Sequence, residues 1–303
     1  MYFGIDLGGT KTAIGLGYGE GERIEIRCSI RIPTHAKAGP LAFFQRAVEA
    51  MDKLLFDNNM NRNCLKGIGI GCTGPIDSEK GIIMNPYTLP GWESFDIADR
   101  FHEVFRVPVS IGNDVDVILL GEIALSQMHH KNVSLIMFGT GIGISCYQQG
   151  SLHTTSSRYH PEMGHTIVSE SGPPCYCGNQ GCMESLVSGK ALNASAREAG
   201  FNNFEDLYQK YLEADELAVA LMEKKLHQMA SGIWNILLVF HSDIVILGGG
   251  LMHTFYDFFT EQLSKYIPQS VDFTGNFVFL KTHTGDLSGI VGAITLVQES
   301  RES

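Results

Sequence analysis

The chain of 303 residues lacks any long hydrophobic run. No segment approaches the roughly 20 consecutive apolar residues that a membrane-spanning helix needs. The first residues, MYFGIDLGGT, also lack the basic stretch followed by an apolar stretch that marks a secretory signal. These absences argue against a membrane partner and predict a cytoplasmic protein.

Positive charge is scarce as well. The sequence has 22 Lys and Arg against 33 Asp and Glu, a net charge of −11, and it contains no basic cluster. Nucleic-acid-binding proteins neutralise phosphates with grouped Lys and Arg. We therefore expect no nucleic-acid partner. The charge balance does not argue against small anionic ligands, because backbone amides can bind them.

Cysteine is the third scarce feature, with seven residues in the chain. Cys28, Cys64, Cys72 and Cys146 are scattered through apolar segments, as small hydrophobic residues often are. A disulfide framework is not expected in a reducing compartment. The length predicts two domains, and no Pro- or Ser-rich linker separates them.

The order of the predicted elements suggests an internal duplication. Residues 3–17 and 132–150 each predict a strand, a glycine turn and a second strand. The remaining predictions are an amphipathic helix at 41–56, a strand and Gly-Pro turn at 67–77, a strand, polar loop (112–114) and helix at 107–125, a mostly helical region at 190–240, and a buried strand ending in glycines at 243–252. This pattern is typical of a duplicated α/β architecture.

Three glycine-rich loops follow predicted strands. They are Gly8-Gly9-Thr10-Lys11, Gly139-Thr140-Gly141 and Gly248-Gly249-Gly250. Glycine lets the backbone approach a bulky anion, so that successive N–H groups can point at phosphate oxygens. None of the loops fits the phosphate-loop pattern ending in GK[ST] or the GxGxxG pattern. A nucleotide would therefore bind in a different fold from those.

Two carboxylates adjoin predicted strand ends. Asp6 lies in an apolar strand, where it could bond to a neighbouring turn or anchor hydrated Mg²⁺ beside a polyphosphate. Asn113-Asp114 follows a buried strand and precedes a helix. Asp114 could cap that helix or act as general base for a sugar hydroxyl attacking a γ-phosphorus.

The stretch CYCGNQGC places three thiols within eight positions, and His165 precedes them by ten residues. Three thiolates and one imidazole suit a closed tetrahedral Zn²⁺ site. A redox role is the competing interpretation, but there is no CxxC pair. We favour a structural zinc held by His165, Cys175, Cys177 and Cys182. Glu162 and Glu184 flank this element, either as solvated side chains or as part of a polyol-binding surface.

Taken in chain order, the motifs resemble the ROK family (repressors, open reading frames and kinases) of the actin-like ATPase superfamily of sugar kinases. The segments that carry the resemblance are GIDLGGTKT (4–12), GIGCTGPID (69–77), GNDVD (112–116), FGTGIGI (138–144), EMGH (162–165), CYCGNQGCMES (175–185), VILGGG (245–250) and GDLSGIVGA (285–293). They span essentially the whole chain. The resemblance implies a two-lobed, duplicated ribonuclease H-like fold with an active cleft between the lobes.

The resemblance also implies roles, position by position. The first phosphate loop would comprise Asp6, Gly8, Gly9, Thr10 and Lys11, with Asp6 near Mg²⁺; the second would comprise Gly139, Thr140 and Gly141; the adenosine segment would be Gly248, Gly249 and Gly250. Asp114 matches the catalytic base. The sugar contacts would be Gly74, Asn113, Asp114, Glu162, His165 and Glu184, with His165 binding zinc through one ring nitrogen and sugar through the other.

The sequence departs from the family pattern at three places. Thr88 replaces an asparagine that reaches the sugar, which leaves hydroxyl selectivity open. Asp116 stands in GNDVD where the family commonly has NDAN, and the segment 156–165 is similar to fructokinase-like members. The acceptor therefore stays open among glucose, fructose, mannose, N-acetylglucosamine and N-acetylmannosamine.

We expect an ATP-dependent kinase that phosphorylates a hexose or N-acetylhexosamine at its 6-hydroxyl with Mg-ATP, although relatives that use polyphosphate leave the donor open. One alternative is an inactive sugar sensor. The other is a transcriptional regulator of the same family that lacks its DNA-binding domain, because the few residues before the first glycine loop leave no room for one. Expected lobes are residues 1–117 with 290–303, and 118–289. A homodimer is expected from the resemblance alone.

Overall fold

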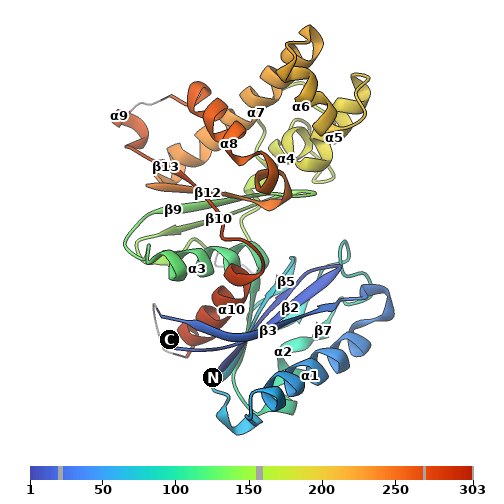
Figure 1. The fold of residues 1–303 in the computed structure, drawn as a ribbon, viewed down its shortest axis with the longest axis vertical. Helices are drawn as coiled ribbons and strands as arrows, with labels where there is room; N and C mark the ends of the chain where they lie inside the picture. The colour runs from blue at the N-terminus through green and yellow to red at the C-terminus, as the bar shows by residue number, and fades with distance from the viewer. Residues whose placement is uncertain (20–22, 155–159, 269–270, 302–303) are drawn as a thin grey trace. The chain divides into compact units, whose positions relative to one another are not determined.

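The computed structural model describes residues 1–19, 23–154, 160–268 and 271–301. Its contacts divide the chain into two units (Figure 1). Unit 1 comprises Met1–His130, Gly150–Pro161 and His283–Ser303, and unit 2 comprises Lys131–Gln149 and Glu162–Thr282. The lobe boundaries and the inter-lobe cleft expected from the sequence stay predictions. Residues 156–159 of the fructokinase-like segment lie outside the described residues.

Unit 1 is built on a sheet with the strand order β3-β2-β1-β4-β8. The strands are β1 (Tyr2–Leu7), β2 (Lys11–Tyr18), β3 (Glu25–Pro33), β4 (Gly67–Cys72) and β8 (Val109–Asn113). β1 and β2 form the predicted hairpin, while β1, β4 and β8 run parallel. Every residue of β4 is buried, as expected for a central strand covered on both faces.

Helices cover this sheet. They are α1 (Pro40–Asp57), α2 (Ile97–Phe105), α3 (Asp114–Ser126) and α10 (Leu287–Glu299), with short turns η1 (Ala36–Ala38) and η2 (Arg62–Cys64) and a small sheet of β5 (Ile76–Asp77), β6 (Ile82–Ile83) and β7 (Phe95–Asp96). The helix predicted at 41–56 is confirmed as α1. The helix α10 lies so close to β4 that a Cβ added at Gly69 would come within 1.6 Å of the Ala293 carbonyl oxygen.

Unit 2 repeats the arrangement. Its strands lie in the order β10-β9-β12-β13. The two-residue strand β11 (Ser151–Leu152) falls within the residue range of unit 1. The strands are β9 (Val133–Phe138), β10 (Ile142–Gln148), β12 (Ile244–Gly248) and β13 (Val278–Lys281). β9 and β10 form an antiparallel hairpin and β9, β12 and β13 run parallel, which is the order seen in unit 1. The predicted duplication is therefore confirmed.

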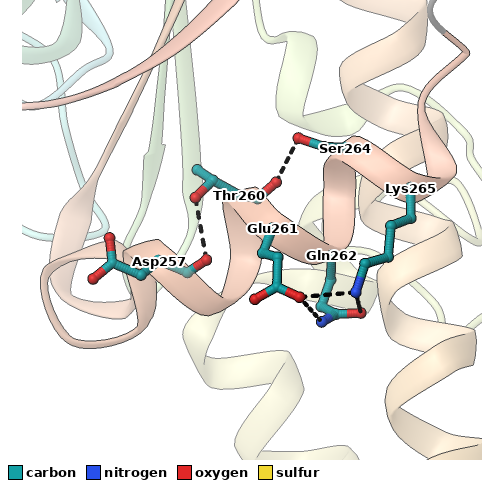
Figure 2. A network of polar contacts seen from close by, with 6 residues as sticks. All are labelled: Asp257, Thr260, Glu261, Gln262, Ser264 and Lys265. Atoms are coloured by element: carbon teal, nitrogen blue, oxygen red, sulfur yellow. Dashed lines mark hydrogen bonds and ion pairs between the residues drawn. The ribbon is translucent and has the colours of Figure 1, made fainter.

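The helical region predicted at 190–240 is also confirmed. The helices of unit 2 are η3 (Met163–His165), α4 (Met183–Val187), α5 (Gly189–Glu198), α6 (Phe204–Leu212), α7 (Glu216–Phe240), α8 (Gly249–Tyr266) and α9 (Val271–Thr274). Figure 2 shows the polar face of α8, where Lys265 pairs with Glu261 at 2.9 Å and Ser264 donates to the Thr260 carbonyl. Exposed pairs of this kind contribute little to stability, because water screens them. Within the described ranges, no helix combines the length and apolar character needed to cross a membrane.

Two local predictions were wrong. No polar loop separates β8 from α3, because Asn113 keeps extended backbone angles while its side chain accepts a hydrogen bond from the Val115 N–H and caps the helix. The glycines after Leu247 do not simply end a strand. Gly249 begins α8 with a φ of +87°, a conformation that favours glycine.

Candidate functional site

Three parallel strands of unit 1 bring predicted site residues to one edge of the sheet. Asp6 of β1 pairs with Gly71 of β4, and Cys72 pairs with Asn113 of β8. Asp6, the segment after Cys72, and Asp114 therefore lie at neighbouring carboxyl ends. This is the edge at which open α/β sheets bind ligands.

Asp114 is held by hydrogen bonds to both of its carboxylate oxygens. Oδ2 accepts from the Thr73 hydroxyl at 2.7 Å, and Oδ1 accepts from the Val115 N–H at 2.9 Å. Burial raises the pKa of Asp114, while the bonds from Thr73 and Val115 oppose that rise. The carboxylate is thus fixed in orientation and keeps lone pairs for a further proton. Sequence analysis did not identify Thr73, since a lone threonine after a strand carries no distinctive signal.

Asp6 lies beside the first glycine loop. Burial, then the negative charges of Asp114 and Asp286, raise its pKa to about 7, and Lys11 partly opposes them. A recess of about 270 Å³ is lined by Asp6, Gly8, Gly9, Thr10, Lys11, Ala13 and Asp286. The negative charges of these carboxylates repel one another, and a cation bound between them would relieve that repulsion. Mg²⁺ prefers carboxylate oxygens and water as ligands, so the residues fit a hydrated magnesium ion.

The first glycine loop is anchored from behind by threonines. The Gly8 N–H donates to the Lys11 carbonyl at 3.2 Å, and the Thr34 hydroxyl donates to the Gly8 carbonyl at 2.6 Å. The hydroxyls of Thr34 and Thr12 lie 2.9 Å apart, both fully buried. The loop is therefore held rigidly, as a preformed anion site requires.

The loop that carries Thr88 is organised by Asn85, which sequence analysis also missed. Asn85 is fully buried, and its side chain bonds to Thr73 and to Thr88. Thr88 in turn lies against the glycine loop, since a Cβ added at Gly9 would meet the Thr88 carbonyl oxygen at 3.1 Å. On the other side, a Cβ at Gly74 would meet the Asn113 amide nitrogen at 3.0 Å. The structure thus brings the predicted sugar contacts of unit 1 beside Asp114 and the first glycine loop.

Two further side chains near Asp114 were likewise not identified as a pair from the sequence. His160 Nδ1 lies 3.0 Å from Asp116 Oδ2, and both side chains are largely buried. The charge of His160 lowers the pKa of Asp114, whereas the charge of Asp116 raises it. Asp116, which departs from the common family pattern, therefore has a histidine partner within unit 1.

In unit 2 the other two glycine loops lie together. A Cβ added at Gly249 would come within 2.4 Å of the Phe138 carbonyl oxygen, directly before Gly139. The Gly139 carbonyl accepts from the Gly189 N–H at 2.9 Å, and its own N–H donates to the Gly141 carbonyl at 3.0 Å. The segments Gly139–Gly141 and Gly248–Gly250 therefore meet at the ends of β9 and β12.

Glu184 ties this region to the cysteine-rich element. Its Oε2 accepts from the Ile142 N–H at 2.7 Å and lies so close to Gly141 that an added Cβ would be 2.4 Å away. Tyr176 is largely exposed, but partial desolvation of its hydroxyl, then the charge of Glu184 and a hydrogen bond to it, raise the pKa of Tyr176, and the charge of Glu162 adds to this. Glu162 and Glu184 thus both lie near Tyr176, a residue for which the sequence carries no signal.

The four predicted zinc ligands converge. One ligand atom each from His165, Cys175, Cys177 and Cys182 lies within 4.8 Å of the others. His165 Nδ1 is 3.2 Å from Cys175 Sγ, and the Sγ atoms of Cys177 and Cys182 are 3.6 Å apart. Ligands about 2.0–2.3 Å from one tetrahedral ion would be separated by roughly 3.5–3.8 Å. The donor set and its spacing fit Zn²⁺.

The second ring nitrogen of His165 has a partner within unit 2. His165 Nε2, which the resemblance assigns to the sugar, lies 3.0 Å from the Tyr176 hydroxyl. The predicted sugar contacts therefore form two groups, one around Asp114 in unit 1 and one around Glu184 in unit 2. That both groups face a single sugar stays a prediction.

Comparison with known proteins places these motifs in one family. The ROK family model matches residues 2–300. The chain belongs to the ROK family. It is 25% identical to a glucokinase of Halalkalibacterium halodurans over 324 aligned positions, which cover 100% of this chain and 96% of the relative. It is 30% identical to an N-acetylmannosamine kinase of Vibrio vulnificus over 253 positions, 82% of each chain.

Solved structures show the same fold. A ROK hexokinase from Thermus thermophilus superposes with a TM-score of 0.84 at 25% identity and covers 100% of this chain and 99% of its own. A ROK family glucokinase from Streptomyces griseus, solved with glucose and AMPPNP, superposes with a TM-score of 0.72 at 22% identity over 98% and 99% of the two chains. The ROK protein therefore has the predicted actin-like ATPase fold.

Proposed function

We propose that this ROK protein transfers the γ-phosphoryl group of ATP to the 6-hydroxyl of a hexose or N-acetylhexosamine. One observation carries the proposal: Asp114, held by Thr73, and the half-buried Asp6 lie at adjoining carboxyl ends of one sheet, beside a glycine loop. The first carboxylate suits an acceptor alcohol and the second suits a cation on a polyphosphate. Kinship to a glucokinase and an N-acetylmannosamine kinase supports this acceptor class.

In the proposed mechanism, Asp114 accepts the proton of the sugar hydroxyl as its oxygen attacks the γ-phosphorus. Hydrogen bonds to both of its oxygens fix the orientation of the Asp114 carboxylate, so the base is already in position when the acceptor sugar binds. Gly74, Thr88 and Asn113 would orient the sugar from unit 1, and Glu162, His165 and Glu184 from unit 2. Positioning and charge neutralisation supply most of the rate enhancement in phosphoryl transfer.

The nucleotide phosphates would rest on backbone N–H groups of residues 8–11 and 139–141, with Lys11 adding positive charge and Gly248–Gly250 holding the adenosine. Asp6 would hold Mg²⁺ through its water shell, and the bound ion supplies neutralisation of the charge on the β- and γ-phosphates. A structural Zn²⁺ on the cysteine-rich element would fix the loop that leads to Glu184. A homodimer stays an expectation.

A coupled assay of ADP release tests the proposal. The purified protein would be supplied with Mg-ATP and, in turn, glucose, fructose, mannose, N-acetylglucosamine and N-acetylmannosamine, with polyphosphate as an alternative donor. We expect turnover with at least one sugar and none with its 6-deoxy analogue. Tight sugar binding by calorimetry without turnover on any sugar would instead support a sugar sensor.

A further inference from the structure

The amide of Asn85 uses all of its hydrogen-bonding positions within unit 1. Its Oδ1 accepts from the backbone N–H groups of Tyr87 and Thr88, at 2.8 and 3.0 Å. Its Nδ2 donates to the Thr73 carbonyl at 3.0 Å and to the Thr88 hydroxyl oxygen at 2.6 Å. The fully buried Asn85 therefore links the loop that carries Thr88 to Thr73, which donates a hydrogen bond to Asp114.

The partners of Asn85 fix which way its amide points. A backbone N–H can only donate and a carbonyl can only accept, so oxygen must face Tyr87 and nitrogen must face Thr73. The second Nδ2 proton then goes to Thr88. Because the Thr88 oxygen receives this bond, the hydroxyl proton of Thr88 points elsewhere. Thr88 is exposed, so its proton is available to a ligand.

We propose that Asn85 is a positioning residue that makes Thr88 a hydrogen-bond donor to the acceptor sugar, and so selects a sugar with an accepting oxygen at that point. The inference rests on the proposed function, because it takes the ligand beside Thr88 to be the sugar. The inference also bears on the departure from asparagine at Thr88: this hydroxyl has a single proton, and the bond accepted from Asn85 directs that proton away from Asn85.

The test uses monodeoxy and monodeoxyfluoro analogues of the best-bound sugar, with affinities measured by calorimetry on the full chain. Fluorine retains weak acceptance but cannot donate, while the deoxy position does neither. At one ring position the wild-type protein should bind the fluoro analogue at least threefold more tightly than the deoxy analogue. In Asn85→Asp, an acceptor replaces Nδ2 and captures the Thr88 proton, so this ratio should fall to about one.

Thr88→Val should abolish the same ratio, and this surface substitution keeps the test valid if Asn85→Asp does not fold. Thr88→Ser, which retains the hydroxyl, should restore it. Asn203→Asp is the matched control, because an aspartate caps α6 as well as the present asparagine does; its ratio should equal that of wild type.

The inference is overturned if wild-type protein binds fluoro and deoxy analogues equally at every position, or if folded Asn85→Asp or Thr88→Val keeps the wild-type ratio. These outcomes differ from failure of the proposed function. Absence of turnover on every sugar would refute the kinase proposal, whereas the affinity ratios would still decide the role of Asn85.

Discussion

The hydroxyl of Thr73 lies 2.7 Å from Oδ2 of Asp114, at the point where β4 ends and α3 begins. This contact joins two neighbouring strands through a hydrogen bond to the predicted base. A hydroxyl that donates to a carboxylate favours the ionised form and lowers its pKa, here against the effect of burial. Thr73 therefore fixes the orientation of the Asp114 carboxylate and favours its ionised form, which can accept a proton.

Asp114→Asn should retain sugar binding and lose most turnover. The amide is nearly isosteric with the carboxylate but cannot accept the proton of the attacking hydroxyl, so kcat should fall roughly 10²- to 10⁴-fold. Steady-state kinetics and sugar calorimetry measure the two effects separately. Turnover close to that of wild type would remove Asp114 from the role of base.

Thr73→Val should shift the pH profile. Without the donated hydrogen bond the pKa of Asp114 rises, and because a base must be ionised to work, the acidic limb of kcat/KM should move to higher pH. We expect roughly a tenfold loss at neutral pH, in line with the strength of one hydrogen bond to a charged group. Thr73→Ser should restore the profile; a uniform loss at all pH values with both variants would contradict this assignment.

Asp6 predicts a second pH effect, on stability. Its pKa is raised from 3.8 to about 7 in the folded protein, so between these values the folded state binds the proton more strongly than the unfolded state does. This contribution therefore makes stability fall as pH rises from about 4 to 7. Its upper bound is roughly 4 kcal/mol, at 1.36 kcal/mol per pKa unit.

Without Mg²⁺ or nucleotide, Asp6→Asn should therefore melt at a higher temperature than wild type at pH 8, and the difference should shrink at pH 5. Mg-ATP should stabilise wild type more than the variant. Asp96→Asn controls for the loss of one charge, because Asp96 caps α2 and asparagine caps equally well. Equal melting of Asp6→Asn and wild type at both pH values would refute the raised pKa.

Local patterns predicted more of the fold than of the site. The hairpins, α1, the buried β4 and the duplication follow from periodicity and glycine turns, which depend on neighbouring residues. Asp6, Asp114 and the His165 cluster carried chemical signals at short spacing. Thr73, Asn85 and Tyr176 did not, because their roles arise from contacts such as Thr73–Asp114, 41 residues apart. The 112–114 region was misjudged because one Asn113 side chain replaces a loop by capping α3 directly.

Gly249 should be intolerant of substitution. An alanine there would have to adopt φ +87° and place its Cβ within 2.4 Å of the Phe138 backbone, so Gly249→Ala should lower the melting temperature by several degrees and weaken ATP binding. Gly250→Ala is the matched control for stability, because a Cβ at Gly250 meets nothing within 4 Å. Equal melting of the two variants would show that the close approach to β9 is not needed.

The cysteine-rich element predicts one zinc ion per chain. Cys177 and Cys182 present thiols 3.6 Å apart beside Cys175 and His165. The residues of the loop from 173 to 180 are exposed, apart from the partly buried Cys175, so few apolar contacts stabilise the loop without an ion. Metal analysis of the purified protein should find about one equivalent of Zn²⁺. Chelation, or Cys182→Ser, should lower the melting temperature and reduce sugar affinity, because Cys182 directly precedes α4, which carries Glu184.

Cys28→Ser is the control for the zinc prediction, since Cys28 lies on β3 of unit 1 and is not part of the cluster. It should retain the full zinc content and the same response to chelation. Zinc added back after chelation should restore melting and sugar affinity together, because both depend on the same folded loop. A chelated protein that melts and binds sugar as before would show that the four side chains converge without holding a structural metal.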